Sequence, residues 1–222
     1  MVLVKTCGLN TADSVKTALG AGADYFGFIH YARSPRHVSV DDTRALVDIL
    51  PRDAQTVQVL VDPDDALLDA VTGEGSPSFL QLHGKETPQR VAAVAQRLGK
   101  PIIKAVSVRT AADVAAAQAY LPHVHALLFD AKPPSDEGWL PGGNGLSFDW
   151  EILAQSWLKG QRWFLSGGLT AENVVKAIAL TYAPGVDVSS GLESAPGVKD
   201  SEKITAFVAA AKSRGHGQSN GI

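Results

Sequence analysis

The feature that most constrains the fold is a regular succession of short, apolar, β-rich segments along the 222-residue chain. Their last residues are Cys7, His30, Val61, His83, Val106, Asp130, Ser166 and Ser189. Five of the seven intervals between these ends are 22 to 24 residues long. Apolar strands alternating with helices are typical of parallel sheets covered on both faces. One strand–helix unit repeated about eight times predicts an α/β fold, a single (β/α)₈ or TIM barrel.

Helical spacing and start signals occur between these segments. Apolar stripes include Val91/Val94/Leu98, Trp150/Leu153/Trp157 and Ile204/Phe207/Val208. Candidate helix starts are Asn10 with Asp13, Thr110 with Asp113, and Asp200 ahead of Ile204. Ser, Thr, Asp and Asn at these places accept hydrogen bonds from the first free N–H groups of a helix. The pattern predicts a barrel over residues 1–213 and a disordered tail over 214–222, which is rich in Gly and polar residues.

Composition narrows the possible partners. The 20 Lys and Arg against 23 Asp and Glu give a net charge of −3, so no excess positive charge is available to hold nucleic acid. One cysteine cannot form an internal disulfide. No apolar run approaches the roughly 18 residues that a membrane span needs, and the first segment carries Lys5 in place of a long apolar signal core. We expect a cytoplasmic protein without nucleic-acid or membrane partners.

Two intervals are longer and place extra residues after the second and sixth strands, over 31–40 and 131–148. The second contains KPPSDEGWLPGGNG, which is rich in Gly and Pro and has no period. Both lie at the C-terminal ends of strands, where barrel active sites are built. They are either binding loops or lids, or tolerated surface insertions.

Polar side chains gather at the strand ends. Alternate residues of a strand share a face. If the last residue of each strand points into the barrel, the residue two positions before it does so as well. The inward-facing pairs would then be Lys5/Cys7, Phe28/His30, Gln81/His83, Lys104/Val106, Leu128/Asp130 and Asp187/Ser189. Buried polar groups are costly without a partner or a task. Their convergence on one mouth predicts an active site there.

Two glycine-containing turns follow the last two strands. They are Ser166-Gly167-Gly168 and Ser189-Ser190-Gly191. Glycines let the backbone approach an anion closely, and N–H groups near a helix start bind it without a fixed charge. The loops after strands seven and eight form the common phosphate site of these barrels. The pair predicts that the ligand is a phosphorylated small molecule.

Three further residues are candidates for chemistry. Cys7 ends the first strand, and Lys5 on the same face would favour the thiolate and lower the thiol pKa from about 8.5. Asp130 ends an apolar strand and could donate a proton. Arg36, in a loop, could hold a carboxylate by two parallel hydrogen bonds. The alternative roles are a buried apolar Cys7, a capping or loop-bracing Asp130 and a solvated Arg36.

The segments KTCGL (5–9), GADYFGFIHYARSPRHV (22–38), QLHG (81–84), SGGLTAENV (166–174) and VDVSSGLESAPGVKD (186–200) are similar to those of phosphoribosylanthranilate isomerases of tryptophan biosynthesis. The resemblance runs from about residue 3 to 213. It implies a cofactor-free Amadori rearrangement of N-(5-phosphoribosyl)anthranilate to 1-(2-carboxyphenylamino)-1-deoxyribulose 5-phosphate, with no metal. It assigns Cys7 as general base and Asp130 as general acid.

The resemblance also implies binding roles. Arg36 corresponds to the anchor of the anthranilate carboxylate, and His83 and Asp187 to residues that line the ligand. Gly167, Gly168, Ser189, Ser190 and Gly191 correspond to the phosphate site. Three departures from the family pattern are His30 in place of Phe, Asn144 in place of Ser or Thr, and the strand ending Leu60–Pro63. They bear on the anthranilate pocket and the loop after the sixth strand. A monomer or weak homodimer is expected.

Two alternatives stay open at this point. His30, His83, Asp130 and Asp187 together resemble the ligands of a metal-dependent sugar-phosphate epimerase, although this gives no task to Cys7 or Arg36. A barrel that binds phosphorylated ligands without catalysis would keep the phosphate loops but would not need an acid and a base.

Overall fold

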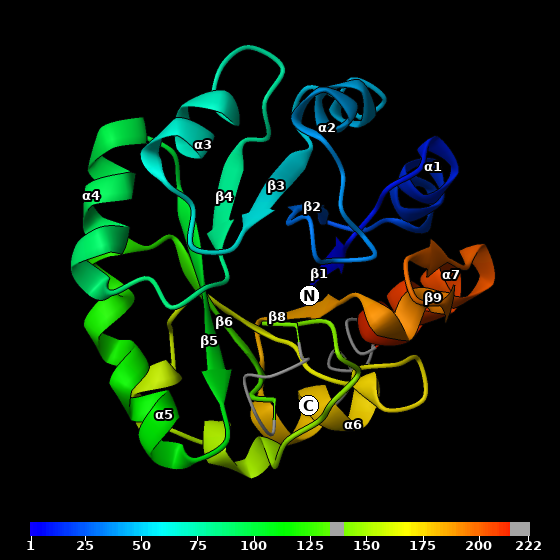
Figure 1. Ribbon diagram of the computed structural model, residues 1–222. Coiled ribbons are helices and arrows are strands. Elements are labelled where there is room, and N and C mark those ends of the chain that lie inside the picture. Colours follow the sequence, from blue (N-terminus) through cyan, green and yellow to red (C-terminus); the bar gives the residue numbers. More distant parts are fainter. Residues whose placement is uncertain (134–139, 214–222) are drawn as a thin grey trace.

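The computed structural model describes residues 1–133 and 140–213. Eight parallel strands form a closed barrel in which β1 pairs with both β2 and β8 (Figure 1). The strands are β1 (Leu3–Cys7), β2 (Tyr25–His30), β3 (Gln55–Leu60), β4 (Phe79–Leu82), β5 (Ile102–Val108), β6 (Ala126–Ala131), β7 (Trp163–Leu165) and β8 (Gly185–Val188). The predicted barrel is confirmed, and each predicted strand end lies within two residues of the observed one.

Helices surround the barrel and cover the outer faces of its strands (Figure 1). They are α1 (Ala12–Ala21), α2 (Val40–Val47), α3 (Asp65–Ala70), α4 (Pro88–Leu98), α5 (Ala111–Ala116), α6 (Val174–Thr181) and α7 (Ser201–Lys212). Short 3₁₀ helices are η1 (Ala117–His123), η2 (Trp150–Leu153), η3 (Ser156–Leu158) and η4 (Ser190–Leu192). A small hairpin, β9 (Glu193–Ala195) with β10 (Val198–Lys199), follows η4.

Helix starts follow local hydrogen bonding. Thr110 and Asp113 form the predicted reciprocal cap of α5, and Asp200 caps α7 as predicted. The start at Asn10 is wrong by one residue, because Thr11 accepts the hydrogen bond from the Ser14 N–H. The apolar stripe from 150 to 157 does not form an α-helix. Ala154, with ψ of 47°, leaves the helical region and splits the stripe into η2 and η3.

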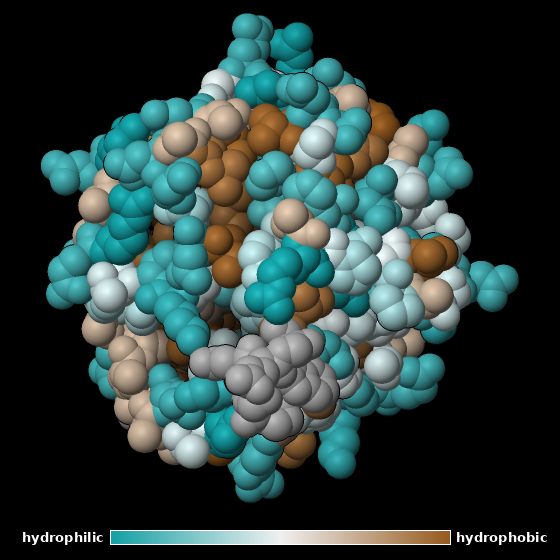
Figure 2. Space-filling model, in the orientation of Figure 1, coloured by the Kyte–Doolittle hydropathy of each residue, from teal (hydrophilic) through white to brown (hydrophobic). Residues whose placement is uncertain are grey.

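Apolar residues fill the barrel and the layer between barrel and helices. The inner cluster includes Val57, Phe79, Ile103, Leu128 and Phe164. The outer cluster joins strand residues such as Phe28 to helix residues such as Phe207. Figure 2 shows that hydrophilic residues cover much of one face, with hydrophobic residues between them. Within residues 1–133 and 140–213, no helix has the length and hydrophobicity needed to cross a membrane.

The predicted inward pairs are correct for β1, β4, β6 and β8 and wrong for β2 and β5. Phe28 belongs to the outer cluster, whereas Ile29 packs against the inner one. On β5 the inward residues are Ile103 and Ala105. The side-chain period of a strand is two residues, so an error of one in the end residue reverses every assignment.

Lys104 therefore lies on the outer face of β5, where it is buried in an ion pair. Its Nζ donates to Glu86 Oε2 at 2.7 Å and to the Gly84 carbonyl at 2.8 Å. Glu86 also accepts from the Asp62 and Gly84 N–H groups. The pair therefore ties the loop after β4 to β5. Both side chains are only 3% exposed, so neither charge has much contact with water.

Candidate active site

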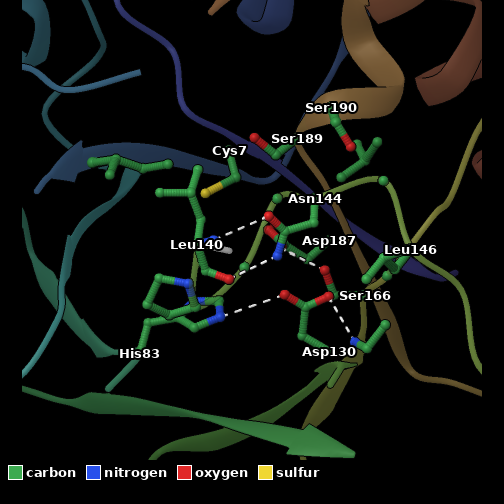
Figure 3. Close-up of a pocket in the computed structure, with 18 of the residues that line it drawn as sticks. Cys7, His83, Asp130, Leu140, Asn144, Leu146, Ser166, Asp187, Ser189 and Ser190 are labelled. Carbon is green, nitrogen blue, oxygen red and sulfur yellow. Dashed lines mark hydrogen bonds and ion pairs between the residues drawn. The ribbon is translucent and has the colours of Figure 1, made fainter. Parts of the chain in front are cut away.

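A pocket opens at the C-terminal ends of the strands, at the predicted mouth (Figure 3). Its lining includes nine of the ten predicted site residues, namely Cys7, His83, Asp130, Gly167, Gly168, Asp187, Ser189, Ser190 and Gly191. Arg36 is the exception and lines an adjoining groove. Residues as far apart in sequence as Cys7 and Gly191 thus meet because the barrel closes between β1 and β8.

Cys7 lies above an ion pair at the end of β1. Lys5 Nζ donates to Asp187 Oδ1 at 2.7 Å, and Asp187 Oδ2 accepts from the Ser166 hydroxyl at 3.2 Å. Burial raises the pKa of the Cys7 thiol, and this exceeds the opposing effect of Lys5. The expectation of a lowered thiol pKa is therefore wrong, because Lys5 shares its charge with Asp187 and the thiol is cut off from water.

Lys5 itself remains a strong cation. Burial alone would lower its pKa, but Asp187 and Cys7 oppose this and the net pKa is raised. A thiolate formed at Cys7 would therefore meet a fixed ammonium group at the bottom of the pocket. This arrangement would stabilise a negative charge on the sulfur.

Asp130 approaches the pocket from a different side than Cys7 (Figure 3). Its Oδ1 accepts from the Ala131 N–H at 2.9 Å, and its Oδ2 lies 3.4 Å from His83 Nε2. Gln81 Nε2 is 2.9 Å from His83 Nδ1. A donor at Nδ1 leaves the proton of a neutral imidazole on Nε2, where it faces Asp130. Gln81 therefore orients His83 toward the candidate acid.

Two buried atoms of this group are open for further bonding. Gln81 Oε1 and His83 Nε2 are buried without a hydrogen-bond partner in the part of the chain that the structure describes. His83, which was predicted to line the ligand, thus lies beside Asp130. Its Nε2 is close enough to interact with the carboxyl group of Asp130.

The glycine turns after β7 and β8 meet at one end of the pocket. Gly167 and Gly168 have φ of 91° and 63°, the left-handed region that glycine adopts without strain. Their N–H groups donate no hydrogen bond to another described residue. Ser190 begins η4 on the facing turn, so its hydroxyl and N–H lie at the start of a helical turn. These groups can bind an anion without a fixed positive charge.

The loop after β6 covers the pocket between these groups. Of the predicted loop 131–148, residues 134–139 lie outside the described residues, as does the predicted tail 214–222. Residues 140–146 line the pocket. Asn144 closes this turn on itself, because its Nδ2 donates to the Leu140 carbonyl at 2.7 Å and its Oδ1 accepts from the Leu140 N–H (Figure 3). Asn144, one of the three departures from the family pattern, therefore hydrogen-bonds to the backbone of the loop and not to Cys7 or Asp130.

Arg36 is buried in the adjoining groove and held by a carboxylate. Its Nε donates to Glu193 Oε1 at 2.6 Å, and its Nη2 donates to Glu193 Oε2 at 2.8 Å. Lys199 Nζ donates to the same Glu193 Oε1 at 2.8 Å and to the Ser189 carbonyl at 2.9 Å. Burial opposes ionisation of Glu193, but Arg36 and Lys199 outweigh it and the pKa of Glu193 is lowered.

His30 does not join the site. Its Nδ1 lies 2.9 Å from the Val38 carbonyl, and its ring packs against His37. The structure therefore does not bring together the four residues of the epimerase alternative. Among residues 1–133 and 140–213, no group of three or more His, Cys, Asp or Glu side chains has the geometry of a metal site.

Two residues that the structure places around Arg36, Glu193 and Lys199, are not among those that the sequence predicts for the site. Both belong to the segment 186–200 that carries the family resemblance, but nothing local in that segment points to Arg36. The contact joins positions 157 residues apart in the chain. The spacing of residues along one strand cannot reveal a contact between residues so far apart in the chain.

Comparison with known proteins agrees with this geometry. The family model described as N-(5'-phosphoribosyl)anthranilate (PRA) isomerase matches residues 4–210. The N-(5'-phosphoribosyl)anthranilate isomerase of Paramagnetospirillum magneticum is 50% identical over 212 residues, which cover 95% of this chain and 97% of that protein.

Solved structures show the same fold. A phosphoribosyl anthranilate isomerase in complex with reduced 1-(o-carboxyphenylamino)-1-deoxyribulose 5-phosphate superposes with a TM-score of 0.82 at 32% identity, over 96% of this chain and 100% of that one. Monomers generated from the dimeric enzyme of Thermotoga maritima give a TM-score of 0.82 at 33% identity over the same shares. The chain therefore belongs to the N-(5'-phosphoribosyl)anthranilate isomerase family.

Proposed function

We propose that Cys7 and Asp130 carry out acid–base catalysis in this protein. The protein is an isomerase of tryptophan biosynthesis that converts N-(5-phosphoribosyl)anthranilate to 1-(2-carboxyphenylamino)-1-deoxyribulose 5-phosphate. The observation that carries the assignment is the placement of a buried thiol and a buried carboxyl on different sides of one pocket. An aldose–ketose rearrangement needs a proton donor and a proton acceptor around one sugar.

Asp130 acts first in the proposed sequence. Its proton goes to the furanose ring oxygen, the bond between that oxygen and C1 breaks, and the nitrogen lone pair forms the C1–N double bond of a protonated Schiff base. The Ala131 N–H and His83 Nε2 lie beside the carboxylate that remains. Both are placed to stabilise its negative charge.

Cys7 acts second. Its thiolate removes the proton from C2, and the electrons move to form an enolamine, which tautomerises to the ketone. Lys5 supports the thiolate from below, while Asp187 holds Lys5 in place. Asp130 is the proton donor in ring opening and Cys7 is the proton acceptor at C2, so the proposal assigns neither step to a cofactor.

The remaining site residues bind the two ends of the substrate. The phosphate lies on the turns Gly167–Gly168 and Ser189–Gly191, whose N–H groups face the pocket end, and His83 and Asp187 line the sugar between them. Arg36 binds the anthranilate carboxylate from the adjoining groove. This order places the ribose between Cys7 and Asp130.

Fluorescence of the anthranilate substrate provides the test. Cys7→Ser and Asp130→Asn should each lower kcat about 10²- to 10⁴-fold. Both should keep the far-UV circular dichroism and unfolding midpoint of the unaltered protein. Asp53→Asn, the same change at an exposed position, should keep full activity. Full activity in both site variants would reject the acid–base assignment, and a well-folded unaltered protein without turnover would reject the activity itself.

We propose a cytoplasmic location and a monomer or weak homodimer. The balanced charge and the absence of a spanning helix among the described residues support a protein that works in an aqueous compartment. The dimer is a property of the Thermotoga maritima enzyme and serves only as a reason to measure this chain. Sedimentation at several concentrations would distinguish the two states.

A further inference from the structure

The guanidinium of Arg36 is fixed on one edge by Glu193. The two hydrogen bonds, from Nε and Nη2, are 2.6 and 2.8 Å long and form a fork. Arg36 and Glu193 side chains are each 4% exposed. A buried fork of this kind restricts both the position and the plane of the guanidinium.

The fork determines which donors remain for a ligand. Arginine has five N–H groups, of which Glu193 takes one on Nε and one on Nη2. The unused donors are on Nη1 and the outer side of Nη2, and together they form a second edge that matches a carboxylate. Nη1 lies beside Gly143, where an added Cβ would be 2.8 Å from that nitrogen. Gly143 lines both the groove and the pocket, so this edge lies where the two adjoin.

Other contacts fix Glu193 in turn. Its Oε1 accepts from Lys199 at 2.8 Å, and its Oε2 accepts from the Gly197 N–H at 3.3 Å. The β9–β10 hairpin therefore carries Glu193 to Arg36, and Lys199 connects it to the Ser189 carbonyl of the phosphate turn. Two basic side chains, Arg36 and Lys199, thus share one carboxylate beside the pocket, although burial lowers the pKa of Lys199.

The stem of Arg36 also lies next to the base. A Cβ added to Gly8 would be 2.7 Å from Arg36 Cδ and 3.1 Å from Ser189 Oγ. Gly8 follows Cys7 directly in the chain. A shift of Arg36 would therefore change the distance between its guanidinium, which binds the carboxylate, and the thiol of Cys7. A guanidinium free to rotate would present its carboxylate-binding edge only part of the time and would bind the aromatic acid more weakly.

We propose that Glu193 is a positioning residue that presents the Nη1–Nη2 edge of Arg36 to the substrate carboxylate and thereby sets specificity for the anthranilate group. This inference rests on the proposed role of Arg36. Glu193 does not touch the substrate itself. Its effect should consequently depend on whether the substrate has a carboxylate.

Two substrates test this dependence. One is N-(5-phosphoribosyl)anthranilate, and the other is N-(5-phosphoribosyl)aniline, the same aminoaldose without the carboxylate. Glu193→Gln keeps the size of the side chain but puts an amide N–H against an arginine donor, so one bond of the fork is lost. We expect KM for the anthranilate substrate to rise roughly 10-fold, the effect of losing one charge-assisted hydrogen bond. KM for the aniline substrate should change less than about 2-fold, and kcat for both less than about 3-fold.

Matched variants separate positioning from folding. Glu202→Gln, the same change at an exposed position of α7, should leave both substrates unaffected. Glu193→Asp keeps the charge but shortens the reach, so its KM for the anthranilate substrate should be intermediate; it replaces Glu193→Gln if that variant does not fold. Arg36→Met should raise the same KM at least as much. The double variant Arg36→Met with Glu193→Gln should add nothing, since both act through one contact.

The outcomes are distinct. Equal losses for both substrates in Glu193→Gln, or additive losses in the double variant, would overturn the positioning role and indicate a structural one. Equal losses for both substrates in Arg36→Met would reject Arg36 as the carboxylate anchor, and the inference with it. An unaltered protein that converts neither substrate would reject the proposed function instead.

Discussion

Lys5 and Asp187 face each other across the seam between β1 and β8, with Nζ 2.7 Å from Oδ1. The two residues are direct register partners, so the pairing that closes the barrel also fixes the cation under Cys7. Since Asp187 takes part of the Lys5 charge, burial dominates at the thiol and its pKa is raised. The Cys7 thiol therefore stays mainly protonated until the pH rises.

The first prediction concerns pH. Only the thiolate of Cys7 can accept the C2 proton, and a raised pKa means that deprotonation extends above the ordinary thiol value of about 8.5. We expect the rate of alkylation of Cys7 by iodoacetamide to increase with pH, close to 10-fold per unit, between about pH 7 and that value, because only the thiolate reacts. Alkylation is measured in place of turnover, since turnover also depends on the proton of Asp130. The measurement is the loss of free thiol from pH 6 to 10, with circular dichroism at each pH to confirm folding. An alkylation rate that is already level from pH 6.5 would contradict a raised thiol pKa.

The second prediction concerns His83. Its Nε2 faces Asp130 at 3.4 Å, so a side chain that keeps a donor there should retain part of the rate. We expect His83→Leu to lower kcat about 10-fold, the loss of one hydrogen bond to the carboxylate that remains after Asp130 gives up its proton, and His83→Gln to lower it less. Single-turnover measurements on both variants would separate this from product release. Equal rates in the two variants would show that the donor on His83 has no effect on Asp130.

The third prediction concerns the covering loop. A Cβ added to Gly142 would lie 2.5 Å from His83 Nε2 and 2.6 Å from Asp130 Oδ2, so Gly142→Ala must displace the loop or the acid. Displacement of catalytic groups by about 1 Å is worth about 100-fold, and we expect a loss of kcat/KM between about 10- and 100-fold. Gly20→Ala is the control, because nothing lies within 4 Å of its added Cβ and it sits in α1. Full activity of Gly142→Ala would mean that the loop does not rest on Asp130 in solution.

The fourth prediction concerns stability away from the pocket. Lys104→Met leaves the Glu86 charge buried without its partner, and we expect a loss of about 3–5 kcal/mol in the free energy of unfolding. Glu86→Gln added to Lys104→Met should recover part of this, because the second change removes the uncompensated charge. Urea denaturation of the unaltered protein, of Lys104→Met and of the double variant measures these free energies of unfolding. Arg97→Met, which breaks an exposed pair with Asp65 and Asp69, should have little effect. A similar small effect for Lys104→Met would show that Glu86 takes up a proton or water at low cost.

The barrel itself could be predicted because its signal is local and repeated. Each strand is a short apolar run with a polar end, and errors of one or two residues at one end do not propagate to the next unit. Inward assignments failed at Phe28 and Lys104 because they depend on a two-residue period. The stripe from 150 to 157 failed because apolar spacing does not reveal that Ala154 leaves the helical region.

Residues that the strand repeat places at the mouth of the barrel could be predicted from the sequence, whereas contacts between distant segments could not. Cys7 and Asp130 end strands, and Gly168 follows one, so the repeat alone placed them at the mouth. Glu193 is functional only through Arg36, and that contact arises when the hairpin after β8 folds back over the loop after β2. The pKa of Cys7 was predicted in the wrong direction for the same reason, since Asp187 and burial were outside the local pattern.

The seam between β1 and β8 has a consequence for the synthesis of the chain. Lys5 and Cys7 leave the ribosome early, but the partner of Lys5 is 182 residues further on. At about 5–20 residues per second, the two wait roughly 10 to 40 s for Asp187 to be made. A nascent chain that stops before β8 contains both Cys7 and Asp130 but has no closed pocket. The pocket therefore forms only in chains that have been translated through β8, the strand that pairs with β1 to close the barrel.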